Sequence, residues 1–152
     1  MATIGAATAQ DAAREMTIYD TALAPGWQNW SWAKTQLSVE LGGSKRRPIS
    51  VEAGGWQAMY LHHDPFSTAG YSKLSLLIQG TVPAGEVRVF TLTDGKPNGD
   101  AGIVKFANSG WTLVDLSLAS LSAENATIDG IWLQNNTGAD MPKFYVTEIK
   151  LH

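Results

Sequence analysis

The segment from Trp56 to His62 carries three side chains at alternate positions that could recognise a ligand. As a β-strand, it would turn Met59 and Leu61 to one face and Trp56, Tyr60 and His62 to the other. The aliphatic side chains suit a core, so the aromatic face would lie in water. Flat aromatic surface beside polar groups is typical of a binding site.

A second segment repeats this pattern. Trp132 and Gln134 alternate with Ile131 and Leu133, which would again expose a tryptophan beside an amide. The C–H faces of β-linked sugar rings stack on aromatic rings, and their hydroxyls bond to amides and imidazoles. The related stacking of nucleobases contributes about 1–3 kcal/mol per contact. The two segments therefore predict a carbohydrate-binding surface.

Two further tryptophans flank Ser31 and would share a face of a strand. Either they extend the same surface, or they plug the core with their indole N–H groups bonded to backbone. The residues we predict to stack on sugar are Trp30, Trp32, Trp56 and Trp132, with Tyr60, His62 and Gln134 contacting the sugar rim.

Catalytic chemistry has weaker support. His62 and His63 are adjacent, so a strand would send them to opposite faces, where they cannot easily chelate one metal ion. Glycoside hydrolysis needs two carboxylates roughly 5–9 Å apart, and no strand projects such a pair from one face. We therefore predict no catalytic residue, and a small glycoside-active enzyme remains the alternative.

Composition limits the other function classes. The 152 residues suit one domain, and the net charge of −3 with no basic run longer than Lys45–Arg47 argues against a nucleic-acid partner. No stretch approaches the roughly 18 apolar residues of a membrane span, so no membrane partner is expected. The absence of cysteine excludes disulfides, thiol catalysis and cysteine-ligated zinc.

After a short N-terminal segment, the sequence pattern is typical of β-strands throughout. Residues 1–16 lack the apolar core of a signal peptide and are interpreted as a linker or expression remnant, with the domain spanning 17–152. About ten short alternating runs separated by Gly, Pro, Asn and Asp predict an all-β, antiparallel β-sandwich of two sheets. The expected strands are Thr17–Thr21, Trp27–Ala33, Pro48–Ala53, Trp56–His62, Tyr71–Gln79, Glu86–Asp94, Gly102–Ala107, Trp111–Leu118, Ile128–Asn135 and Lys143–Leu151.

Core faces follow from the same alternation. Leu74, Leu76 and Ile78 should point inward, and the Ile131 and Leu133 pair should lie beside Met59 and Leu61. Only Leu118–Glu124 has any helical character.

The stretch Ile18–Ala33, with its Pro-Gly-Trp and Trp-Ser-Trp motifs, resembles the opening of a carbohydrate-binding module of bacterial plant-cell-wall glucanases. Matching pieces follow in order at Pro48–Val51, Tyr71–Leu74, Trp111–Leu116, Ile128–Gln134 and Phe144–Ile149. The resemblance implies a β-jelly roll that is secreted as part of a larger bacterial protein and has no catalysis of its own. It also implies binding of β-glucan (cellulose or another β-1,4-glucan, mixed-linkage glucan or xyloglucan) beside a tethered glycoside hydrolase domain.

Similar modules often close with Tyr-Val-Asp-Asp/Glu-Ile, where the acidic residue can help hold a structural calcium ion. Here Thr147 stands in place of the first acid and Glu148 remains. If the terminal strands pair, Asp20 could meet Glu148, and backbone carbonyls could complete an oxygen shell. We therefore predict a structural Ca²⁺ at Asp20 and Glu148, the alternative being that these acids only solvate turns; no other cofactor is expected.

Two further readings remain open beside the enzyme. One is a lectin-like domain for other glycans. The other is a structural accessory domain in which all six tryptophans are buried.

Overall fold

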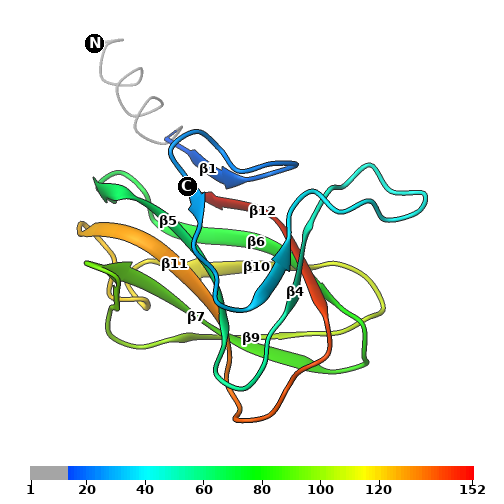
Figure 1. The fold of residues 1–152 in the computed structure, drawn as a ribbon. Helices are drawn as coiled ribbons and strands as arrows, with labels where there is room; N and C mark the ends of the chain where they lie inside the picture. Colours follow the sequence, from blue (N-terminus) through cyan, green and yellow to red (C-terminus); the bar gives the residue numbers. More distant parts are fainter. Residues whose placement is uncertain (1–13) are drawn as a thin grey trace.

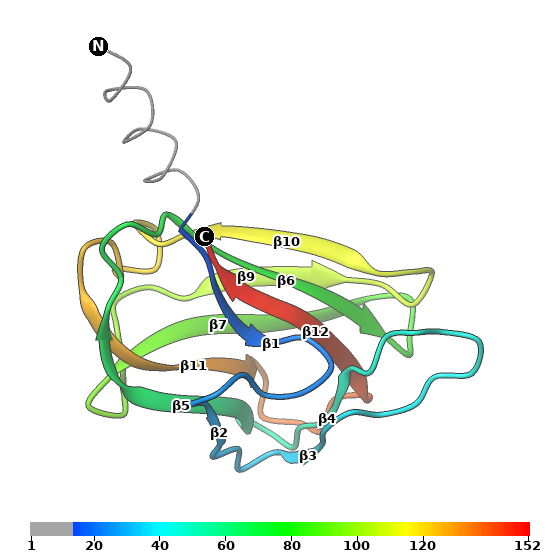
Figure 2. The same cartoon turned by 90° about the horizontal axis from the view of Figure 1, so that it is seen from above.

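The computed structural model describes residues 14–152, which form two antiparallel sheets of six strands packed face to face. Figure 1 and Figure 2 show the two layers, with β5, β11 and β7 in one and β6, β10, β12 and β4 in the other. The predicted all-β sandwich of jelly-roll type is confirmed. Sheet A contains β1 (Met16–Tyr19), β3 (Lys34–Gln36), β4 (Ile49–Glu52), β6 (Lys73–Gly80), β10 (Thr112–Ser117) and β12 (Phe144–Leu151). Sheet B contains β2 (Gln28–Asn29), β5 (Ala58–Ser67), β7 (Gly85–Thr93), β8 (Lys96–Pro97), β9 (Gly102–Phe106) and β11 (Thr127–Asn135).

The core lies between the sheets where the alternation predicted it. In the β5–β11 pair, Met59 lies opposite Leu133 and Leu61 opposite Ile131, and all four side chains are fully buried. Leu74, Leu76 and Ile78 of β6 face them from sheet A and are also fully buried. The core therefore takes the side chains on one face of each of these strands, and the opposite face is turned away from the core.

Two expected strands have clearly different bounds. Only Gln28–Asn29 of the expected strand Trp27–Ala33 has regular strand structure, so Trp30 and Trp32 lie in the irregular segment that follows. Trp56 is not in a strand either: it sits in a turn with φ +62°, and β5 begins at Ala58. The expected end at His62 is also wrong, because β5 continues to Ser67.

The helical character expected of Leu118–Glu124 is wrong as well, since this segment forms consecutive turns. Its backbone closes locally, with Leu121 N donating to Leu118 O at 3.1 Å and Ala123 N to Leu118 O at 2.8 Å. Positive φ angles at Ser122 and Asn125 prevent helix propagation.

The sandwich begins before residue 17. Arg14 lies over the Tyr71 ring at 4.3 Å, Glu15 pairs with Lys150 at 3.4 Å, and Met16 lies opposite Leu151. The last residue of the expected linker, Met16, therefore belongs to the sheet, and Arg14 and Glu15 make side-chain contacts with it, while residues 1–13 lie outside the described part. Within residues 14–152 there is no helix with the length and hydropathy to cross a membrane.

Candidate functional site

The outward face of sheet B carries aromatic rings in a row set by strand register. Trp132 of β11 lies between Tyr60 of β5 and Phe90 of β7. Two residues further along β11 in one direction, Gln134 lies beside Arg88 of β7. Two residues along in the other direction, Gly130 lies beside His62 of β5. Together with three neighbouring tryptophans, these rings form what we call the aromatic face: Trp30, Trp32, Trp56, Tyr60, Phe90 and Trp132.

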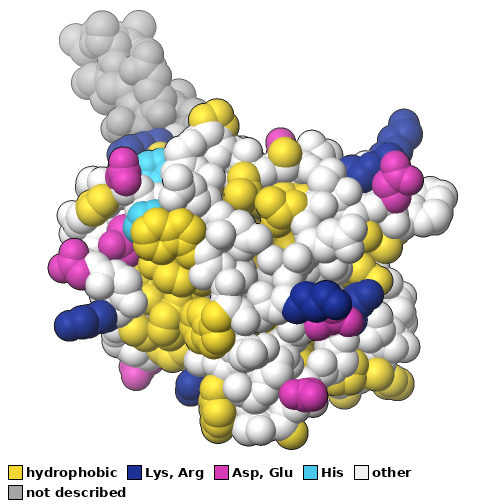
Figure 3. All heavy atoms as spheres, in the orientation of Figure 1, with side chains coloured by type: hydrophobic (Ala, Val, Ile, Leu, Met, Phe, Trp, Pro, Cys, Tyr) yellow, Lys and Arg dark blue, Asp and Glu magenta, His cyan; other side chains and the backbone are white. Residues whose placement is uncertain are grey.

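Three of the residues predicted to stack on sugar have the most exposed aromatic side chains of the molecule. Trp30 is 50% exposed, Trp32 44% and Trp56 49%. Figure 3 shows hydrophobic side chains gathered in a continuous patch, bordered by histidine, over the part of the molecule where β5 and β11 run in Figure 1. Trp30 and Trp32 therefore do not plug the core, and a domain with every tryptophan buried is excluded. Trp27 does enter the core, at 6% exposure.

Trp30 is fixed on three sides. Its backbone N–H donates to Tyr60 O at 2.8 Å, and its indole Nε1 donates to Gln28 Oε1 at 2.9 Å. The His62 ring stacks on the indole with centroids 3.5 Å apart and planes 6° from parallel. Because His62 covers one face of Trp30, a ligand would have to stack on the other.

Trp132 is more buried than the other three tryptophans predicted to stack on sugar. Its half-buried ring meets Trp32 edge-on at 5.0 Å, and it meets Tyr60 and Phe90 edge-on at 6.1 Å each. Its indole Nε1 is buried and has no hydrogen-bond partner among the described residues. Trp132 thus forms the floor on which the exposed rings rest.

Trp56 is held by a bracket of polar side chains. Gln134 Nε2 donates to Trp56 O at 2.7 Å, and Arg88 Nε donates to Gln134 Oε1 at 2.7 Å. The Arg88 guanidinium also lies 5.3 Å from the centroids of both the Trp56 and Phe90 rings. Gln134, predicted as a rim contact, is only 7% exposed, and both of its amide atoms are already bonded within the protein.

Sequence reasoning missed Arg88 and Phe90. Both alternate with Val87 and Val89, which enter the core, so the period-2 pattern of this strand does place them on the outer face. What it could not supply was the pairing of β7 with β11, which sets Phe90 beside Trp132.

Tyr60 remains a hydrogen-bond donor over a wide pH range. Burial, and to a smaller extent the nearby carboxylate of Asp129, raises the pKa of Tyr60 above its ordinary value. Its hydroxyl lies 3.5 Å from His62 Nδ1. Two predicted rim residues are therefore neighbours at one end of the aromatic face.

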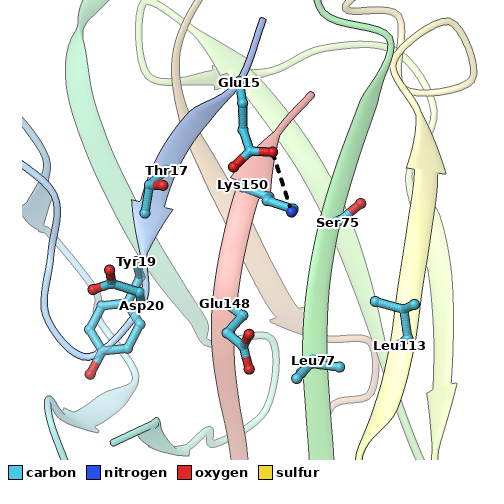
Figure 4. Close-up of a pocket in the computed structure, with 9 residues that line it drawn as sticks. All are labelled: Glu15, Thr17, Tyr19, Asp20, Ser75, Leu77, Leu113, Glu148 and Lys150. Atoms are coloured by element: carbon cyan, nitrogen blue, oxygen red, sulfur yellow. Dashed lines mark hydrogen bonds and ion pairs between the residues drawn. The ribbon is translucent and has the colours of Figure 1, made fainter. Parts of the chain in front are cut away.

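The two residues predicted to hold calcium lie on the opposite sheet. Asp20 and Glu148 line one cavity of about 340 Å³ on the outer face of sheet A, seen in Figure 4 together with the Glu15–Lys150 pair. Glu148 Oε2 accepts from Arg46 Nε at 3.0 Å, and Asp20 Oδ1 accepts from the backbone of Thr21 at 2.5 Å. Among residues 14–152 no group of three or more His, Asp or Glu could hold a metal ion. These acids thus supply few of the six to eight oxygens that Ca²⁺ takes, and the calcium site stays a prediction.

Comparison with known proteins gives one sequence relative of interest. No protein-family model matches the chain. An endoglucanase from Dictyostelium discoideum is 21% identical over 144 residues, which cover 88% of this chain. The match spans only 20% of that endoglucanase's length.

Solved structures give closer matches in shape. A family 29 carbohydrate-binding module from Piromyces equi (CBM29_1) has a TM-score of 0.62 at 17% identity, covering 91% of this chain and 89% of its own. A CBM29-2 variant complexed with cellulohexaose has a TM-score of 0.64 at 16% identity, covering 91% and 89%. A second CBM29-2 variant, complexed with mannohexaose, has a TM-score of 0.64 at 14% identity, covering 91% and 90%.

These relatives change one expectation from the sequence. The source organisms named above, Piromyces equi and Dictyostelium discoideum, are not bacteria, so the comparisons give no support to a bacterial glucanase origin. At identities of 14–17%, the likeness to the solved structures establishes that this chain has the β-sandwich fold seen in family 29 carbohydrate-binding modules.

Proposed function

We propose that this protein is a non-catalytic carbohydrate-binding module that binds β-glucan chains by stacking them on Trp30, Trp32 and Trp56. The single observation that carries the proposal is that these three indoles, each about half exposed, lie on one face of sheet B. Exposed aromatic surface of this size is costly in a protein that has no ligand for it.

Three further features support a polysaccharide ligand. The aromatic face is an open surface across several strands, which suits an extended chain of sugar rings. It is edged by groups that can bond hydroxyls, namely Tyr60, His62 and the guanidinium of Arg88. Proteins of the same fold have been solved with cellulohexaose and with mannohexaose.

The partner we propose is a glycoside hydrolase domain on the same chain of a secreted protein. The sequence relative is an endoglucanase that is much longer than this chain. Tethering would hold such an enzyme near insoluble substrate by raising its effective concentration there.

Affinity gel electrophoresis against cellulose derivatives, mixed-linkage glucan, xyloglucan, mannan and xylan tests the proposal. We expect a β-1,4-glucan to slow the wild type and Trp56→Ala to be slowed much less, since one stacking contact contributes about 1–3 kcal/mol, or about 5- to 150-fold in affinity. Trp27→Phe is the matched control, because Trp27 is buried. No retardation by any glucan, or equal retardation of Trp56→Ala, would contradict it.

The same gels separate the alternatives. Selective retardation by a glycan without β-linked glucose or mannose favours a lectin-like domain, and release of reducing sugar from the gel favours an enzyme. Lanes with EDTA, and melting curves with millimolar CaCl₂, test calcium at Asp20 and Glu148. A calcium-dependent rise in Tm would support that site, and unchanged curves would contradict it.

A further inference from the structure

Asp129 is an unusual residue in this molecule. It is the single charged side chain among the buried residues described, at 6% exposure. It lies on β11 where the register with β5 shifts between Ile128 and Gly130. Within residues 14–152 it has no ion-pair partner, and its one side-chain hydrogen bond comes from Gly95 N at 3.5 Å.

A carboxylate has about four acceptor sites, so Asp129 is far from satisfied. Among the described residues, the one fully buried side-chain polar atom without a hydrogen-bond partner is Trp132 Nε1, so the second Asp129 oxygen keeps some contact with solvent. A donor from outside the protein, such as a sugar hydroxyl, can therefore reach Asp129 and fill an acceptor site that the described residues leave open.

Two other polar atoms converge on the same place. The Tyr60 ring crosses above Gly130, since a Cβ built there would meet Tyr60 Cε1 at 2.8 Å. The Tyr60 hydroxyl then reaches the turn at Gly95, which also donates to Asp129. The Tyr60 Oη to His62 Nδ1 distance is 3.5 Å. A contact this long is weak, so both groups can also bond a further hydroxyl or water.

Resting on the proposed function, we propose that Asp129, Tyr60 and His62 form a subsite that binds a hydroxyl of a sugar ring lying beside Trp30, on the side of the indole that His62 covers. His62 connects the two parts, because it stacks on Trp30 and faces the Tyr60 hydroxyl. The Asp129 carboxylate accepts from the sugar hydroxyl in a charge-assisted hydrogen bond.

The subsite also gives the aromatic face two different ends. Arg88, a donor, lies in the row of Gln134, whereas Asp129, an acceptor, lies next to Gly130. Four residues of β11 separate these rows, or about 13 Å at 3.3 Å per residue. A sugar chain has a reducing and a non-reducing end, so this polar difference favours one direction of binding.

Calorimetric titration with cellohexaose and mannohexaose, paired with melting curves, tests the subsite. We expect Asp129→Asn to weaken binding of the better ligand by about tenfold or more, because a hydrogen bond to a charged group is lost. Its Tm should stay close to that of the wild type, because Asp129 has no ion-pair partner to lose among the described residues. Tyr60→Phe should weaken the same ligand, and Asp115→Asn, on the outer face of sheet A, should leave binding unchanged.

Binding by Asp129→Asn within twofold of wild type would overturn the subsite, as would weaker binding accompanied by a matching fall in Tm. The double variant of Tyr60→Phe and Asp129→Asn should lose less than the sum of the single losses, since both residues bond one hydroxyl. Trp30→Ala separates this inference from the proposed function. If wild type binds and Trp30→Ala does not, yet Asp129→Asn binds normally, only the subsite fails.

Discussion

At the scale of single residues, the stack of His62 on Trp30 determines how the most exposed indole is presented. With centroids 3.5 Å apart and nearly parallel planes, the imidazole keeps the indole from rotating. This role differs from the rim contact predicted from sequence, although the two can coexist.

We expect His62→Ala to weaken glucan binding about 2- to 10-fold, because an aromatic pair contributes about 0.5–1.5 kcal/mol. His63→Ala is the matched control, since His63 contacts Trp27 and Phe66 instead, at 5.0 Å each. It should lower Tm but keep affinity. Titration of both variants decides the matter, and equal affinities for His62→Ala and wild type would refute the supporting role.

The residue types of the site were predictable from sequence, whereas their roles were not. Alternation placed Tyr60, His62 and Trp132 on the outer face of sheet B, as observed. Whether an aromatic ring is free to stack on a ligand or instead supports other rings depends on neighbours from other strands. Trp132 is in contact with Phe90 of β7 and with Trp32. Such long-range pairing leaves no local trace in the chain.

At the scale of elements, the turn before β5 is what exposes Trp56. Gly55 lies so close to the opposing loop that a Cβ on it would meet Gly138 O at 2.4 Å and Gly138 C at 2.6 Å. Trp56 N also donates to Thr137 O at 2.9 Å. The two loops thus fix the turn in which Trp56 adopts its positive φ.

Gly55→Ala should therefore destabilise the protein by about 1–3 kcal/mol and weaken glucan binding, because the turn must shift to relieve the overlap. Gly42→Ala is the control, since apart from its two chain neighbours no residue comes within 4 Å of a Cβ built there. Denaturant unfolding and gel retardation of the two variants provide the comparison. Normal stability of Gly55→Ala would show that the loops separate freely.

Neighbouring strands of sheet A are joined by a polar contact that depends on pH. The Ser75 hydroxyl of β6, which donates to Asp115 of β10, holds the pKa of that carboxyl below its ordinary value of 3.8, with smaller help from Lys73 and His152. Since the pKa is lower in the folded state, its contribution to stability is present above about pH 4 and is lost as pH falls through the lowered value.

Asp115→Asn should consequently flatten the fall in Tm between pH 5 and pH 2, by a small amount because the carboxylate is 44% exposed. Ser75→Ala removes the donor and should have a similar effect on the slope. Melting curves across this range provide the measurement. Identical slopes for Asp115→Asn and wild type would mean that the contact contributes nothing to folding.

At the scale of the whole molecule, the two outer faces of the sandwich carry different kinds of side chain. Sheet B carries the aromatic face, and sheet A carries ion pairs such as Arg46–Glu148 and Lys150–Glu15. The two-layer fold was predictable, because each of the ten alternating runs has one apolar face that must be buried against a second sheet. The short strands β3 and β8 were not, because two or three residues give no period to detect.

The pairing of β1 with β12 has a consequence for how this domain can be joined to others. Met16 and Leu151 are opposite each other in the sheet, about 5 Å apart, and Figure 2 shows the C-terminal end beside β1. The domain can thus be spliced into a surface loop of a host protein without forcing the loop apart. It also suits circular permutation, with the chain joined near Met16 and Leu151 and reopened at the uncrowded Gly42–Gly43 turn, where the cut would spare sheet B.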